Sequence, residues 1–132
     1  MVMGARLSIL VLDDDIAFLE SFGDLLAREG HSIFPATTGN QAIEIVRRRR
    51  IDLSFLDFDL PDADGTETLH RIHCLWPKLP AIFVSGNPSA TLEEIIFSAG
   101  GLALLRKPFE TGQLRLLMKE IVQKHCPNQP EL

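Results

Sequence analysis

Apolar residues follow two alternating patterns along the chain. Short, nearly continuous apolar runs are separated by segments in which apolar residues recur every three or four positions. The first pattern is typical of strands that are buried on both faces, and the second is typical of helices that bury one side. We therefore predict strands at residues 7–12, 31–36, 53–58, 81–84 and 102–106, each followed by a helix.

The predicted helices have recognisable beginnings and ends. Helical spacing begins at Ile16, Asp15 is the expected N-cap, and Gly30 is the expected stop. Two residue pairs have the spacing of a capping box and are expected to begin the second and fourth helices: Thr38 with Gln41, and Thr91 with Glu94. The third helix is expected at about 66–75. The last helix carries an apolar stripe made of Leu114, Leu117, Met118, Ile121, Val122 and His125.

Five strand–helix units in succession predict a parallel sheet that is covered by helices on both faces. Pro35 removes a hydrogen-bond donor from the second strand, which favours the sheet edge for that strand. Right-handed crossovers then favour the strand order 2-1-3-4-5 in a doubly wound α/β fold. In such a sheet, ligands bind at the carboxyl ends of the strands, beside the switch point between the first and third strands.

The conspicuous polar residues all lie at those carboxyl ends, namely Asp13, Asp14, Asp57, Ser85 and Lys107. Three carboxylates at one sheet edge repel one another, since two unit charges about 4 Å apart cost roughly 4 kcal/mol at an effective dielectric near 20. A hard divalent cation relieves this repulsion, and oxygen ligands suit Mg²⁺ or Mn²⁺. Because Mg²⁺ commonly shares its shell with a phosphate, the cluster indicates phosphoryl chemistry.

Four motifs in order resemble the response-regulator receiver domain of two-component signalling, which has a flavodoxin-like (βα)₅ fold. They are Asp13-Asp14, Asp57 with Pro61 and Gly65 behind it, Ser85-Gly86, and Lys107-Pro108-Phe109. The resemblance covers residues 7–124, so residues 1–132 are expected to be one receiver domain with a short polar tail at 127–132. It implies a switch that takes a phosphoryl group from a sensor histidine kinase or a histidine phosphotransfer protein, and that catalyses only its own phosphorylation and dephosphorylation.

The resemblance also implies roles at the metal. Asp57 is the nucleophile and phosphoacceptor, and it binds Mg²⁺ together with the Asp14 carboxylate. Asp59 is expected to bind the ion through its backbone carbonyl, and Asp13 chiefly through an intervening water.

Further roles follow for the phosphoryl group. Lys107 is expected to neutralise one phosphoryl oxygen as a point charge, and Ser85 to donate its hydroxyl to another. Gly86 keeps the approach open, while Asn87, like Asp59, occupies a position that tunes the lifetime of the phosphate. Signalling is expected to move the face formed by the last two helices and the fifth strand. Leu104 stands where the family often has an aromatic residue, which puts the usual output coupling in question.

Composition narrows the partners and the compartment. The net charge of −5 argues against nucleic acid as the main partner. Apolar runs fall far short of the roughly 20 residues that span a bilayer. Cys74 and Cys126 lack metal-ligand or redox spacing, which favours reduced thiols and a cytoplasmic protein. Part of the last helix stripe is also suited to a homodimer.

Three other features have ordinary explanations. The four arginines at 47–50 are expected to be a solvated helix end, with docking of an acidic partner as the alternative. His70 and His73 are expected to face solvent, because a third metal ligand is missing in register. Residues 62–65 resemble part of a calcium loop, but Leu60 and Arg71 would occupy loop positions that require carboxylates.

Two competing functions remain open. Asp57-Phe58-Asp59 matches the Asp-x-Asp of phosphatases that use an aspartyl nucleophile, although Asp13-Asp14 is unexpected in those enzymes. A degenerate receiver that acts only as an interaction module is the second competitor, and Leu104 keeps it in play.

Overall fold

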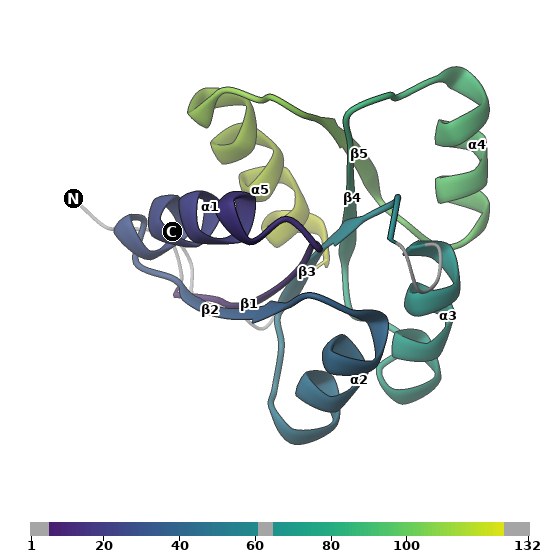
Figure 1. The fold of residues 1–132 in the computed structure, drawn as a ribbon, viewed down its shortest axis with the longest axis horizontal. Coiled ribbons are helices and arrows are strands. Elements are labelled where there is room, and N and C mark those ends of the chain that lie inside the picture. Colours follow the sequence, from purple (N-terminus) through teal and green to yellow (C-terminus); the bar gives the residue numbers. More distant parts are fainter. Residues whose placement is uncertain (1–5, 61–64, 126–132) are drawn as a thin grey trace.

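The computed structural model describes residues 6–60 and 65–125, and within these ranges strands and helices alternate strictly (Figure 1). The elements are β1 (Ser8–Leu12), α1 (Ile16–Arg28), β2 (Ser32–Ala36), α2 (Gly39–Arg48), β3 (Leu53–Asp57), α3 (Gly65–Leu75), β4 (Ala81–Ser85), α4 (Ala90–Ser98), β5 (Ala103–Arg106) and α5 (Thr111–His125). Each predicted strand is confirmed to within one residue at either end. Residues 61–64 and Cys126, together with the tail at 127–132, lie outside the described residues.

The sheet is parallel throughout and has the predicted order β2-β1-β3-β4-β5. Pro35 lies in β2, at the edge, where a missing donor costs no ladder bond to a further strand. The register places Leu12 opposite Leu56, so Asp13 and Asp57 leave neighbouring strands at the same level. Strand pairing thus brings residues 44 positions apart in sequence (57 − 13) to one edge.

Successive strand residues point to opposite faces of the sheet, so each strand contributes to two cores. On one face, Val11, Phe55 and Val84 pack with α1 and α5. On the other face, Leu12 and Phe83 pack with α2, α3 and α4. Figure 1 shows α1 and α5 on one side of the sheet and α2 and α3 on the other. The two apolar layers pack both faces of the sheet and so support the strand ends that carry the site side chains.

The helix ends confirm some of the predicted caps and correct one. The Asp15 side chain caps α1 by accepting a hydrogen bond from the Phe18 N–H at 3.2 Å. Thr38 caps α2, as predicted. The predicted cap at Thr91 and Glu94 is wrong, because α4 begins two residues earlier with Ser89 as its N-cap. Ser89 follows Pro88 and has an extended backbone, which suits an N-cap, and this start buries Leu92.

Gly65 allows α3 to begin directly against the end of β3. A Cβ atom at this position would lie 2.6 Å from Phe83 Cε1 and 2.8 Å from the Asp57 carbonyl oxygen. The Gly65 N–H donates a hydrogen bond to the Phe58 carbonyl at 3.1 Å. Only glycine fits so close to the backbone that carries Asp57. Gly65 is therefore required for the close approach of α3 to the end of β3.

The predicted stripe of α5 is correct for its core and wrong at its end. Leu114, Met118, Ile121 and Val122 are buried, Leu117 is half-buried, and His125 is exposed in the last turn. A histidine near a helix C-terminus is favourable in solvent because it complements the helix dipole. Within the two described ranges, every helix is too short or too polar to cross a membrane.

Candidate functional site

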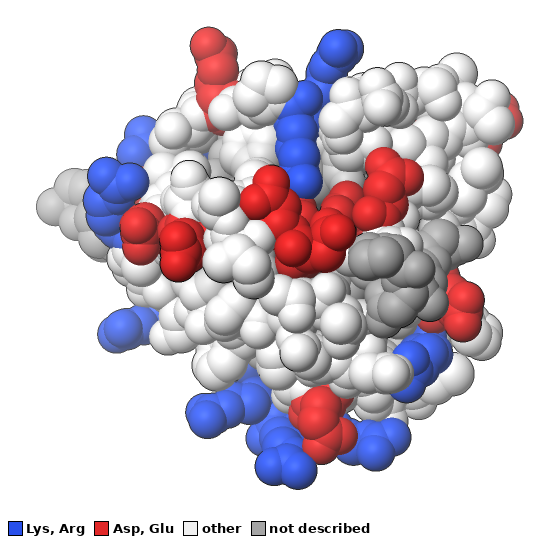
Figure 2. Space-filling view, viewed as in Figure 1, with Lys and Arg blue, Asp and Glu red and all other residues white. Residues whose placement is uncertain are grey.

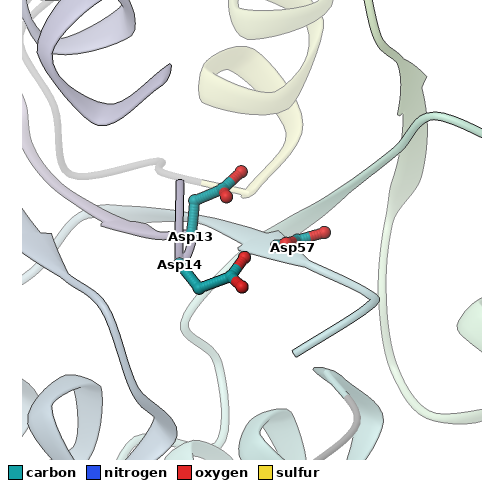
Figure 3. A group of neighbouring side chains, drawn as sticks. All are labelled: Asp13, Asp14 and Asp57. Carbon is teal, nitrogen blue, oxygen red and sulfur yellow. The ribbon is translucent and has the colours of Figure 1, made fainter. Parts of the chain in front are cut away.

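Three carboxylates meet where β1 and β3 end. One oxygen from each of Asp13, Asp14 and Asp57 lies within 4.8 Å of the others (Figure 3). Asp13 and Asp57 are 1% and 6% exposed, whereas Asp14 is open to solvent. In Figure 2 acidic side chains gather at the centre of the face shown, away from the basic ones over α2. The predicted trio is therefore assembled by the fold, with one side open to a ligand.

Burial and the neighbouring carboxylates make Asp57 a weaker acid than a free aspartate. The pKa of the Asp57 carboxyl is raised from 3.8 to about 6, mainly by burial and next by the nearby Asp13 charge. The Asp59 N–H, which donates to Asp57 Oδ1 at 3.2 Å, and the Lys107 ammonium oppose the rise. A carboxylate held in this way gains from any added positive charge.

Lys107 supplies one positive charge from the end of β5. Its Nζ lies 2.6 Å from Asp13 Oδ2, and its side chain is 25% exposed. The other Asp13 oxygen, Oδ1, accepts the Asp15 N–H at 2.9 Å. Lys107 thus pairs directly with Asp13 in the buried site and also lowers the pKa of Asp57 through its charge.

The ends of β4 and β5 add hydroxyl and backbone groups. Ser85 is the buried last residue of β4, and its Oγ accepts the Asn87 N–H at 3.1 Å. The Lys107 N–H donates to the Ser85 carbonyl at 2.9 Å, so the two side chains start from adjacent backbone. A Cβ atom at Gly86 would meet nothing within 4 Å, so the protein itself leaves this approach clear.

The donor set at this edge fits a small, hard divalent cation. Its side-chain ligands are three carboxylates, which are the oxygen donors preferred by Mg²⁺ and Mn²⁺. Three carboxylates share one lysine at this edge, so a divalent cation would reduce their mutual repulsion, and the exposed side of Asp14 leaves room for water or a phosphate. The Asp59 side chain is exposed, in keeping with a contribution from its backbone only.

One contact at the site was not foreseen. The Phe18 ring lies against Lys107, with Nζ 4.2 Å from the ring centroid. Phe18 belongs to the first turn of α1, and no role was predicted for it from the sequence. A ring and a cation that are 89 residues apart (107 − 18) become neighbours only through the sheet order, so no local pattern reveals the pair.

Several residues that were considered lie away from the site. His70 is exposed as expected, but His73 is half-buried, and its Nε2 lies 3.0 Å from the Leu79 carbonyl oxygen, which is a structural role. Cys74 is exposed and is not in a disulfide. Leu104 lies half-buried in β5, opposite Phe83. The motif residue Pro61 lies outside the described residues, as does most of the rejected calcium loop.

The arginines at 47–50 form a helix end with internal partners. Arg48 pairs with Glu44 at 3.0 Å, and Arg50 lies 3.6 Å from Asp52. The Arg49 guanidinium lies over the Phe34 ring, 5.2 Å from its centroid. Three of the four cations have partners within the domain, and all four side chains are exposed, which agrees with the predicted solvated helix end.

Known proteins resemble this chain in sequence and in fold. A family model described as the response regulator receiver domain matches residues 9–119. The transcriptional regulatory protein ZraR of Klebsiella oxytoca is 32% identical over 89% of this chain, and sporulation initiation phosphotransferase F of Bacillus subtilis is 29% identical over 90% of it. A CheY-like response regulator receiver domain protein of Methanospirillum hungatei JF-1 has a structure that superposes with a TM-score of 0.86 over 93% of this chain and 98% of its own, at 30% identity.

The relatives differ in length from this chain. The alignment covers 26% of ZraR, and 52% of the probable transcriptional regulatory protein TcrX of Mycobacterium tuberculosis, but 93% of the Bacillus protein. The chain thus spans about a quarter to a half of these transcriptional regulators, and the likeness concerns the part that they share with it.

Proposed function

The chain belongs to the family of response regulator receiver domains, and we propose that Asp57 is the residue on which it accepts a phosphoryl group. The observation that carries the proposal is the cluster at the sheet edge, where Asp57 lies with Asp13 and Asp14 within reach of one ion and Lys107 stands beside them. The domain is a signalling switch.

The transfer is a displacement at phosphorus. An ionised Asp57 oxygen forms a bond to the phosphorus of a donor phosphohistidine, the phosphorus–nitrogen bond breaks, and the leaving imidazole keeps the electron pair and takes up a proton. Since the Asp57 pKa is about 6 in the metal-free protein, most of the carboxyl is ionised at pH 7 and able to attack. Bound Mg²⁺ or Mn²⁺ supplies positive charge to the reacting oxygens. The chain provides its ligands from Asp13, Asp14, Asp57 and the Asp59 carbonyl.

Lys107 and Ser85 complete the phosphoryl site. Phosphorylation replaces one carboxylate charge with roughly two negative charges and adds acceptor oxygens. Lys107 exchanges its Asp13 partner for one of these oxygens. The Ser85 hydroxyl already accepts the Asn87 N–H, so its own proton is available for a second phosphoryl oxygen. Asn87 and Asp59 border the phosphate and modulate its hydrolysis.

The switch acts through the face formed by α4, β5 and α5. Lys107 and Ser85 belong to the segments that lead into α5 and α4, so their movement toward a phosphoryl group shifts both helices. Exposed apolar side chains on these helices, Ile95, Phe97 and Leu116, are available to a target or to a second copy of the chain. Leu104 provides a smaller, non-aromatic group for this coupling.

The donor is a sensor histidine kinase or a histidine phosphotransfer protein, and the reaction takes place in the cytoplasm. The exposed, unpaired Cys74 suits a reducing compartment. The family of this chain and the name of the Bacillus relative, a phosphotransferase, support a place in a phosphorelay.

Incubation with phosphoramidate and Mg²⁺, followed by intact-mass spectrometry, tests the proposal. We expect one phosphoryl adduct on the wild-type protein, and none on Asp57→Asn or in the presence of a chelator. Asp15→Asn is the matched control, because it removes a neighbouring acidic charge and keeps a good N-cap. An adduct on Asp57→Asn at the wild-type rate would show that another residue is the acceptor. Catalytic turnover of a phosphomonoester that is lost in Asp59→Asn would instead favour a phosphatase.

A further inference from the structure

The Lys107 ammonium has two neighbours of different kinds. Asp13 Oδ2 is its ionic partner at 2.6 Å, and the Phe18 ring is its apolar partner, with the centroid 4.2 Å from Nζ. A cation over an aromatic face within about 6 Å is attracted by the ring quadrupole, more strongly where water is excluded. Only 25% of the Lys107 side chain is exposed, and this partial withdrawal from water favours the attraction.

The position of the Phe18 ring is set by a backbone hydrogen bond and by packing against two other rings. Its backbone N–H donates to the capping Asp15 carboxylate at 3.2 Å, which fixes the first turn of α1 beside the acidic cluster. The ring packs against Phe22 at 5.3 Å and against Phe109 at 6.2 Å between centroids. Phe109 follows two residues after Lys107, so the same aromatic cluster holds the ring and the backbone that carries the lysine.

Free space beside Lys107 gives its side chain room to leave the carboxylates, and the contact with the Phe18 ring opposes this movement. Phe18, Phe22, Lys107 and Phe109 line a hollow of about 450 Å³ between α1 and the segment that leads into α5. A lysine side chain is long and flexible, and it loses rotational freedom when it is confined. Without an attractive wall, an ammonium released from Asp13 is free to swing into this hollow and away from the carboxylates.

We propose that Phe18 is a positioning residue for Lys107 in the phosphotransfer: its ring face holds the ammonium beside the acidic cluster while Asp13 gives up its ion pair. This inference rests on the function proposed above. A neutral ring suits the task, because it attracts the cation without neutralising it and does not compete as a metal ligand. A carboxylate here would add charge to a crowded acidic site, and an aliphatic side chain would offer no electrostatic attraction.

A fluorine series at Phe18 tests the contact with little change of shape. Replacing Phe18 by mono-, di- and trifluorinated phenylalanine weakens the ring quadrupole step by step, while Phe18→Leu removes the ring. With phosphoramidate as a small donor, we expect the rate of Asp57 phosphorylation to fall stepwise, ending about three- to tenfold below wild type in Phe18→Leu. Phe18→Tyr, which keeps the ring, should retain most of the rate.

A second measurement needs neither metal nor donor. In the NMR spectrum of the metal-free protein, the Lys107 methylene protons next to Nζ should show a ring-current shift that is lost in Phe18→Leu and kept in Phe18→Tyr. If the wild-type protein accepts no phosphoryl group while this shift is present, the proposed function fails and the ring contact stands.

The matched control is the same fluorine series at Phe22. This ring belongs to the same cluster but has no contact with the lysine among the aromatic–cation pairs of the described residues. It should show no graded loss of rate, and fluorination of Phe18 should have no further effect once Lys107→Gln has removed the cation. A wild-type rate in Phe18→Leu, or an equal gradient from the Phe22 series, would overturn the proposal.

Discussion

The raised pKa of Asp57 predicts that its ionisation costs stability in the metal-free protein. In the folded state the pKa of Asp57 is raised from 3.8 to about 6, because the carboxyl is buried beside Asp13. The folded state therefore binds the proton more tightly than the unfolded chain does. This contribution to stability is fully present below pH 3.8 and is lost as the pH rises through about 6. Two pKa units at 1.36 kcal/mol each amount to about 3 kcal/mol by pH 7.5.

Asp57→Asn removes this cost, because an amide of nearly the same shape carries no charge. In urea denaturation with a chelator present, we expect the stability of the variant relative to wild type to rise by about 2.4 kcal/mol between pH 4 and pH 7.5, because part of the cost is already present at pH 4. Asp15→Asn is the control, because it makes the same chemical change at the exposed N-cap of α1. A difference between Asp57→Asn and wild type that stays constant from pH 4 to 7.5 would refute the reasoning.

Three further predictions concern the site and its supports. Mg²⁺ should raise the melting temperature of the wild-type protein in a concentration-dependent way, and should do so much less in Asp57→Asn, as followed by thermal denaturation. Gly65→Ala should destabilise the fold by about 1–3 kcal/mol in chemical denaturation, because the new Cβ would lie 2.6 Å from Phe83 Cε1. Gly86→Ala is the control and should stay within about 0.5 kcal/mol of wild type, because its Cβ would meet nothing within 4 Å. Thr68→Val should be neutral or stabilising by about 1 kcal/mol in the same assay, because Thr68 Oγ1 is buried without a hydrogen-bond partner in the described part of the chain. A decrease of more than about 1 kcal/mol in the free energy of unfolding would argue against this.

The sheet and its acidic edge could be predicted because they depend on strong, local signals. Apolar runs, Pro35 and the alternation of elements lead to the observed strand order, and parallel strands place Asp13 and Asp57 together once that order is known. The N-cap of α1 was also predictable, since Asp15 directly precedes a clear helical period. These features follow from backbone geometry and burial alone.

Other features depend on contacts that short-range spacing does not encode. Thr91 and Glu94 have capping spacing, but Ser89 caps α4 because the helix must start early enough to bury Leu92. The half-buried His73 bonds the Leu79 carbonyl across a turn.

The neighbours of Lys107 depend on such contacts as well. Phe18 and Asp13 surround the ammonium only after the first and fifth strand–helix units have come together.

A crystal structure with Mg²⁺ and beryllofluoride, a stable analogue of a phosphoryl group, tests the central claim most directly. The account predicts beryllium bonded to an Asp57 carboxylate oxygen, a metal ion ligated by Asp14 and Asp57 with Asp13 beside it, and Lys107 moved from Asp13 to a fluorine atom. A beryllofluoride group on another residue, or Lys107 still paired with Asp13 beside a modified Asp57, would contradict it.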